Sequence, residues 1–203
     1  MALRLRSKAF EAFGEIPKRY SGEGESLSPP LQWSGVPDGT REFVLLCEDP
    51  DAPTPKPFLH WLLYHLSANT TALSEGLCTN ELIEYPVLAT QGRNTLQKIG
   101  YTGPMPPPWH DAHHYYFRLF ALSAELVVAP GAGREEVLRA MKGHILEETQ
   151  LVGNYEHSLH RRAREVFSTH PALRPALMWL GGGLVSAGLV GLAAKRLGQQ
   201  KAA

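Results

Sequence analysis

Three apolar runs alternate with turn-rich segments in the first two thirds of the chain. Phe43–Cys47 is apolar throughout and stops before Asp49-Pro50, where proline cannot donate to a strand ladder. The runs 61–66 and 115–122 are rich in the aromatic and aliphatic residues that favour strands. No regular alternation of strand and helix links these runs, so we expect antiparallel strands packed as a β-sandwich.

The remaining segments before residue 130 are short and separated by turn residues, such as Ser28-Pro29-Pro30 and Pro37-Asp38-Gly39. The 203-residue chain has 16 prolines and 19 glycines, which favour the same loop-rich architecture. Its 43% apolar and 20% charged content is that of an ordinary globular protein. Length alone predicts one domain, which we place at residues 1–156, with or without an appendage.

The spacing of apolar residues changes between Gly133 and Gln150. Glu135 and Glu136 suit a helix N-terminus. Gly143 interrupts the segment, so one helix and two short helices both fit. We therefore expect a mostly β fold, an antiparallel sandwich with a few peripheral helices. The residues at helical spacing are Val137, Leu138, Met141, Ile145 and Leu146.

The last quarter of the chain is a different kind of sequence. Residues 157–174 form a basic linker, whose apolar residues have the spacing of an amphipathic helix. Residues 175–194 carry no charge over twenty positions, about the length of a transmembrane helix. We expect an apolar C-terminal helix that anchors the protein in a membrane, followed by a basic tail at 195–203. An apolar tail packed on the surface is the alternative, because five glycines weaken helicity in water.

Charge is distributed unevenly along the chain. Residues 1–155 hold 13 Lys and Arg against 18 Asp and Glu, a net of −5, which disfavours binding to nucleic acid. Residues 156–203 hold 7 against 2, a net of +5, which suits an anionic surface. The N-terminus has no apolar run of signal-peptide length, so we expect a cytoplasmic domain that is membrane-associated through its C-terminal segment.

The number and spacing of the cysteines disfavour both a zinc site and a disulfide-stabilised fold. Cys47 and Cys78 are the only cysteines, and their spacing predicts neither a zinc site nor a disulfide scaffold. Cys47 lies within an apolar run, so we expect a buried, inert thiol.

Polar side chains that could bind a ligand occur where the predicted strands meet proline-rich loops. Side chains alternate along a strand, so His113 and Tyr115 share one face. His60 begins a second strand and Asp49 ends a third. Two imidazoles, a phenol and a carboxylate could thus converge, with turn amides near Gly103 as further donors. Such a pocket suits a small phosphate-like or carboxylate anion. It lacks the Arg or Lys of strong phosphate sites, so we expect modest affinity and a marked pH dependence.

The motifs around these residues resemble the phosphatidylethanolamine-binding proteins, also called Raf kinase inhibitor-like proteins, and most closely their bacterial branch. The resemblance covers residues 3–156 and lies in long, ordered motifs. They are Tyr20–Gly24, Ser28–Trp33, Asp49–Pro53, His60-Trp61, Gly100-Tyr101, Gly103-Pro104, Pro106–Pro108, His113 with Tyr115, and Leu151–Gly153.

The resemblance implies an antiparallel β-sandwich that binds phosphorylated head groups and similar anions. Relatives of this kind inhibit kinases or proteases or act as signalling scaffolds, so neither an enzyme nor a cofactor is implied. By matching position, the ligand-binding residues are Asp49, His60, Gly103, Pro106, Pro107, His113 and Tyr115.

The sequence departs from the family pattern at several positions. His114 stands where the family usually has Arg, and Leu59 replaces an aromatic residue. The segment 109–111 occupies a place where glycine is usual. Ser21 and Met105 stand where bacterial relatives often have cysteine, which excludes a disulfide there.

Two other functions compete with anion binding. Asp49, His60 and His113 are the ligand types of a facial metal triad, which would make a metal-dependent enzyme. Metal analysis of the purified protein distinguishes the two interpretations, since a stoichiometric ion bound through these histidines would favour the enzyme. A membrane-tethered scaffold with a vestigial pocket is the third possibility. A triad hydrolase is disfavoured, because no Gly-x-Ser-x-Gly elbow occurs.

Overall fold

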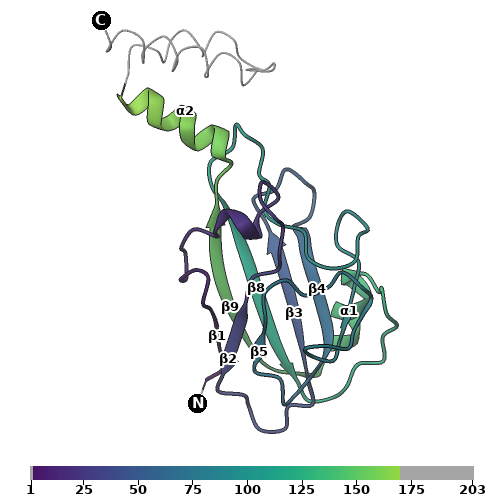
Figure 1. Ribbon diagram of the computed structural model, residues 1–203. Helices are drawn as coiled ribbons and strands as arrows, with labels where there is room; N and C mark the ends of the chain where they lie inside the picture. The colour runs from purple at the N-terminus through teal and green to yellow at the C-terminus, as the bar shows by residue number, and fades with distance from the viewer. Residues whose placement is uncertain (1, 170–203) are drawn as a thin grey trace, which may run out of the picture. The chain divides into compact units, whose positions relative to one another are not determined.

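The computed structural model describes residues 2–169, which form two antiparallel sheets with few helices (Figure 1). The smaller sheet has the order β1-β2-β5, with β1 at Arg4–Ser7, β2 at Leu31–Ser34 and β5 at Ala72–Leu73. The larger sheet has the order β6-β7-β4-β3-β8-β9, with β6 at Leu82–Ile83, β7 at Ala89–Gln91, β4 at Phe58–Ser67, β3 at Glu42–Asp49, β8 at His113–Leu122 and β9 at Ile145–Tyr155.

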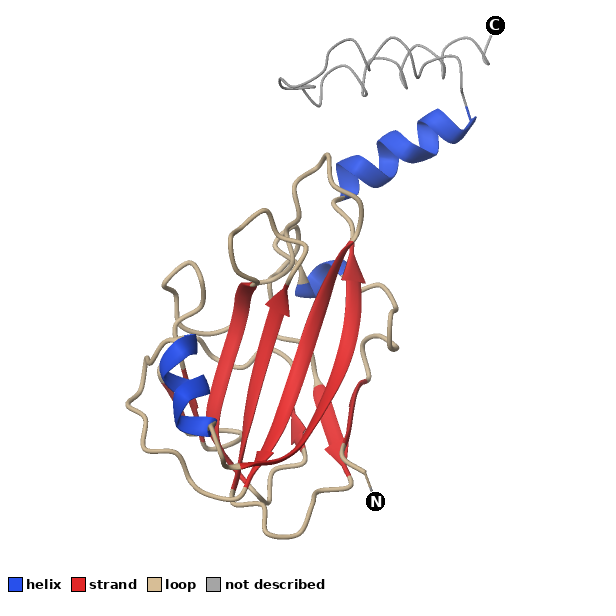
Figure 2. Cartoon of the chain, turned by 180° about the vertical axis from the view of Figure 1, so that it is seen from behind, coloured by secondary structure: helices blue, strands red, loops and turns tan. Residues whose placement is uncertain are grey.

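The larger sheet is covered on both faces. Phe43 and Leu45 pack in the core that also includes Trp33 of the smaller sheet. Val44 and Leu46 point the other way, into a second core with helix α1, Arg134–Met141. Figure 2 shows α1 lying against the large sheet. Burial on both faces explains why β3 reads as a continuous apolar run, and the predicted β-sandwich is confirmed.

The helical expectation for 133–150 is correct only in its first half. Helix α1 ends at Met141, and β9 begins at Ile145. Gly143 lies between them with φ of +84°, a conformation that glycine adopts without strain. Ladder pairing with β8 along nearly all of β9 decides the conformation of this segment. Tertiary pairing thus overrides the helical spacing of Ile145 and Leu146, both of which are exposed.

The described chain divides into two compact units. The first comprises residues 1–106 and 112–155, with the short helix η1 at Lys18–Tyr20. The second comprises 107–111 and, within the described residues, 156–169, with helix α2 at Ser158–Thr169. Within this second unit, Arg164 lies 2.8 Å from the buried carboxylate of Glu156. The domain boundary at residue 156 stays a prediction.

The expected membrane anchor falls outside the described part of the chain. Residues 175–194 and the basic tail 195–203 both lie beyond residue 169. Between residues 2 and 169, no helix combines the length and apolar character needed to cross a bilayer. The structure therefore gives the predicted anchor no support.

Candidate functional site

A buried carboxylate–imidazole pair joins the end of β3 to the start of β8. Oδ2 of Asp49 lies 2.8 Å from Nδ1 of His113, and each side chain is 4% exposed. A carboxylate in this contact accepts, so Nδ1 of His113 carries the proton. The pair fixes the imidazole in one orientation, as Asp or carbonyl partners do in many functional histidines.

The other oxygen of Asp49 closes the loop that follows β3. Oδ1 accepts hydrogen bonds from the backbone amides of Asp51 at 2.8 Å and Ala52 at 3.1 Å. Turns are commonly stabilised by a side chain that accepts a hydrogen bond from the backbone amide two residues later in the chain. Pro50 limits the same loop by fixing its φ. Two backbone amides and the His113 ring therefore help to hold the Asp49 carboxylate in place.

A β-bulge directs His60 toward this pair. The register between β3 and β4 shifts from Cys47↔Trp61 to Glu48↔Leu59, which leaves His60 as an extra residue on β4. Its ring lies edge-on to Tyr115, with centroids 5.1 Å apart. Its Nδ1 lies 2.7 Å from the carbonyl oxygen of Thr102. Because that carbonyl only accepts, Nδ1 carries the proton, and Nε2 of the neutral ring is an acceptor.

Burial sets the ionisation of both aromatic groups. It lowers the pKa of His60 and outweighs the opposing effects of the Thr102 carbonyl and the Asp49 charge. Burial also raises the pKa of Tyr115, as do the Asp49 charge and a hydrogen bond to that carboxylate. At neutral pH the site therefore contains a neutral His60 and a phenol that keeps its proton.

A second carboxylate–imidazole pair lies beside the first, at the protein surface. Oδ2 of Asp51 accepts from the backbone amide of His114 at 2.9 Å and from its Nδ1 at 2.7 Å. Burial raises the pKa of Asp51, but these hydrogen bonds and the His114 charge outweigh it, so that pKa is lowered. His114 thus holds the loop after β3, a role that the sequence did not reveal.

Gly103 and the prolines have structural contacts of their own. A Cβ at Gly103 would lie 2.5 to 2.7 Å from backbone atoms of residues 20–22, so only glycine allows this approach. Its amide donates to Ser26 Oγ at 2.8 Å, so this amide is already occupied. Pro106 is buried in the first unit, whereas Pro107 belongs to the second.

The structure thus brings together Asp49, His60, His113 and Tyr115, which lie on three neighbouring strands of the large sheet. These four residues are between 1% and 5% exposed, so little of the site is accessible to solvent. Two cavities of about 750 and 400 Å³ open elsewhere and include none of the four. The predicted burial of Cys47 is also found, and it raises the pKa of that thiol.

The metal triad of the alternative interpretation is not formed. Among residues 2–169, no three His, Cys, Asp or Glu side chains are placed to share a metal ion. Nδ1 of both histidines is engaged, one with the Thr102 carbonyl and one with Asp49.

Comparison with known proteins gives a consistent family. The model of the phosphatidylethanolamine-binding protein family matches residues 6–156. The chain is 42% identical over 153 residues to a UPF0098 protein of Methanothermobacter thermautotrophicus, covering 75% of this chain and 98% of that protein. A UPF0098 protein of Aquifex aeolicus is 40% identical over 157 residues, covering 76% and 88% of the two chains.

Solved structures agree with this match. The crystal structure of a phosphatidylethanolamine-binding protein homologue from Chlamydia trachomatis is 39% identical, with a TM-score of 0.70, and covers 77% of this chain and 99% of its own. YbcL of E. coli, described as a member of the mammalian family, is 28% identical with a TM-score of 0.71 and the same coverage. The chain belongs to the phosphatidylethanolamine-binding protein family.

Proposed function

We propose that this protein binds a small anion at the Asp49 and His113 pair. The ligand is a phosphate, a phosphorylated head group of the phosphatidylethanolamine kind, or a carboxylate. His60 and Tyr115 complete the binding groups, and Gly103 and Pro106 shape the surrounding loop. The protein acts as a binding or regulatory module, such as a kinase or protease inhibitor or a signalling scaffold, and not as an enzyme.

The buried pair of Asp49 and His113 carries this proposal. Asp49 accepts from Nδ1 of His113 and holds the imidazole in one orientation beside a buried carboxylate. A charge-assisted hydrogen bond of this kind is about twice as strong as a neutral one. Asp49 places a carboxylate in the site, which disfavours a doubly charged ligand.

The neutral state of His60 points to a protonated ligand. Its Nε2 is an acceptor, because Nδ1 donates to the Thr102 carbonyl. A phosphomonoester that keeps one proton supplies a P–OH donor to such an acceptor and carries a single negative charge. Since the second pKa of a phosphomonoester is about 6, affinity should rise as the pH falls toward that value.

Calorimetric titration with phosphorylethanolamine and with inorganic phosphate tests the proposal. Asp49→Ala and His113→Ala should each abolish saturable binding. His144→Ala is the matched control, because His144 is an exposed histidine whose hydrogen bonds are made by its backbone. The proposal is abandoned if both site variants remain folded and titrate like the unchanged protein.

A further inference from the structure

An exposed phenylalanine occupies a backbone conformation that favours glycine. The amide of Gly14 donates to the carbonyl oxygen of Glu11 at 2.8 Å, which closes a turn over residues 11–14. Phe13 is the third residue of this turn and has φ of +60°, a value that is rare for bulky side chains. Its side chain is 65% exposed, so burial within one copy of the chain compensates for little of this strain. Glycine would form the same turn without strain, which indicates that the ring of Phe13 has a further role.

Strand β9 holds this turn through both backbone groups of Phe13. The N–H of Phe13 donates to the carbonyl oxygen of Val152 at 2.6 Å, and its carbonyl oxygen accepts from the Asn154 side chain at 2.8 Å. The backbone is therefore fixed while the ring remains exposed to solvent. An aromatic ring presented from a fixed backbone loses little conformational freedom when a partner covers it.

A hollow lies beside the turn. Strands β1 and β9 are edge strands of the two sheets and lie side by side (Figure 1). A cavity of about 750 Å³ is lined by β1, by residues 8 and 10–12, by Gln32 and by residues 149–151 of β9. Its floor includes the apolar side chains of Leu5, Phe10 and Leu151. We call this cavity the β1–β9 hollow. Since residues 11 and 12 line it, the turn and the hollow form one continuous surface.

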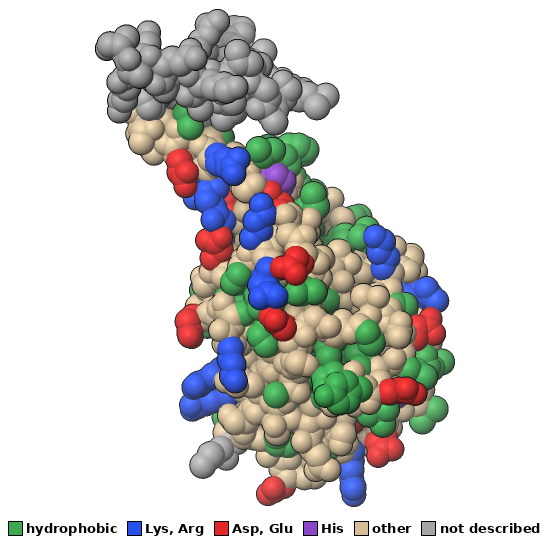
Figure 3. All heavy atoms as spheres, in the orientation of Figure 1, with side chains coloured by type: hydrophobic (Ala, Val, Ile, Leu, Met, Phe, Trp, Pro, Cys, Tyr) green, Lys and Arg blue, Asp and Glu red, His purple; other side chains and the backbone are tan. Residues whose placement is uncertain are grey.

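This surface carries both signs of charge. Three exposed cations line the hollow: Arg4, Arg6 and Lys8. Within residues 2–169, none of the three forms an ion pair. Figure 3 shows Lys and Arg side chains gathered at the lower left, the side on which Figure 1 places β1. Glu11 and Glu15, both exposed, flank Phe13 in the sequence. A projecting ring with acidic neighbours thus lies next to an apolar hollow with a basic rim.

We propose that this surface binds the same surface of a second copy of the chain, in a two-fold symmetric dimer. The Phe13 ring of each copy enters the β1–β9 hollow of the other, and Glu11 of each copy meets Arg6 of the other. A surface that holds a ring and a hollow, and charges of both signs, is complementary to itself, as a two-fold interface requires. Buried aromatic side chains contribute much of the binding energy in such interfaces. The dimer leaves the anion site separate, since the hollow includes none of the four residues there.

Sedimentation equilibrium of the full-length protein tests the role of the ring. We expect a dimer whose dissociation constant rises at least tenfold in Phe13→Gly. Glycine adopts a positive φ without strain, so urea unfolding should show this variant to be folded. Leu88→Ala is the matched control, because Leu88 is an exposed apolar residue just before β7, away from the β9 edge of the large sheet. It should leave the dissociation constant unchanged.

Exchange of charges tests the symmetry of the contact. Arg6→Glu and Glu11→Arg should each weaken the dimer at least tenfold, because each places like charges across the interface. An equimolar mixture of these two variants should form a heterodimer of nearly parental affinity, since both pairs then join opposite charges. Arg41→Glu, at an exposed arginine that does not line the hollow, should leave the dimer unchanged. A monomer at millimolar concentration, a dimer that Phe13→Gly leaves intact, or a mixture that associates no better than its components would each overturn the proposal.

Discussion

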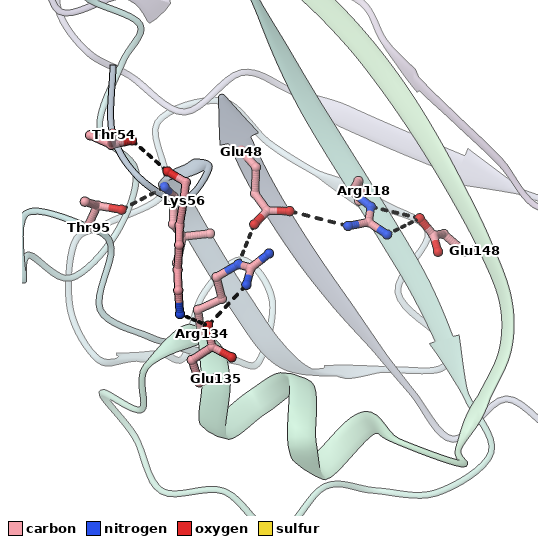
Figure 4. Close-up of polar contacts among 9 residues, drawn as sticks. Glu48, Thr54, Lys56, Thr95, Arg118, Arg134, Glu135 and Glu148 are labelled. Atoms are coloured by element: carbon pink, nitrogen blue, oxygen red, sulfur yellow. Dashed lines mark hydrogen bonds and ion pairs between the residues drawn. The ribbon is translucent and has the colours of Figure 1, made fainter. Parts of the chain in front are cut away.

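Two adjacent carboxylates at the end of β3 are neutralised in different ways. Glu48 points toward the α1 side of the large sheet, where Nε of Arg134 lies 2.5 Å from one oxygen and Arg118 lies 3.4 Å from the other (Figure 4). Asp49 points to the opposite face and meets His113. Both carboxylates are buried, yet one has two arginines as partners and the other has an imidazole.

The different partners of Glu48 and Asp49 indicate different roles for the two carboxylates. Arginine keeps its charge at every accessible pH. Arg118 also pairs with Glu148, and Arg134 with Glu135, so the Glu48 network is balanced within the protein (Figure 4). Histidine gains and loses a proton near neutral pH, and it has a second nitrogen. On the proposed function, the Asp49 pair responds to a ligand, whereas the Glu48 network stabilises the fold.

The largest effect is expected from Glu48→Gln. This change leaves two partly buried arginines without their shared counter-ion, and breaking a buried pair in this way costs about 3 kcal/mol. Urea unfolding measures the loss, while calorimetry should show unchanged binding of phosphorylethanolamine. A variant as stable as the parent, or one that has lost binding, would remove the distinction between the two carboxylates.

Asp49→Asn should lose ligand binding as well as some stability. Loss of the charge-assisted hydrogen bond costs about 2 kcal/mol in unfolding free energy. Binding of phosphorylethanolamine should weaken at least tenfold, because the ring of His113 loses the carboxylate that holds its orientation. The same two measurements apply, and wild-type affinity in the folded variant would refute the role given to Asp49.

Gly103→Ala tests whether this glycine acts through packing. The added Cβ would lie within 2.7 Å of backbone atoms in residues 20–22, and overpacking of this kind costs about 1 to 3 kcal/mol. Thermal or urea unfolding reads the change. Gly133→Ala is the matched control, because a Cβ there meets nothing within 4 Å. Equal stability of the two variants would contradict the packing role.

The smallest effect concerns the pH dependence of stability. Burial lowers the pKa of His60 in the folded protein, so the unfolded chain binds the proton more readily. The stability contributed by His60 is therefore present above its unfolded pKa, about 6.5, and is lost as the pH falls below it. His60→Gln should lose less unfolding free energy between pH 7.5 and 5.5 than the parent or His144→Ala. Equal losses in all three would contradict this sign.

The sequence predicts the central strands well and their irregularities poorly. The continuous apolar run of β3 and the aromatic run of β8 identify both strands, because burial leaves a strong pattern. Strand β9 was missed altogether, and its first half was expected to be helical, since pairing with β8 outweighs the helical spacing of Ile145 and Leu146. Local sequence does not report a partner strand.

The candidate site shows the same limit. Alternation along β8 correctly places His113 and Tyr115 on one face. The prediction that His60 begins its strand was wrong, because a bulge within β4 turns this residue toward the site. The pairing of Asp51 with His114 was also missed, since it depends on how the loop after β3 folds back.

The most direct test of the central claim is an NMR titration of inorganic phosphate that follows the imidazole signals of His113 and His60. The account predicts saturable chemical-shift changes at both rings, with a higher phosphate affinity at pH 5.5 than at pH 7.5. The signals of His144 should not shift. Shifts confined to other histidines, or tighter binding at the higher pH, would contradict it.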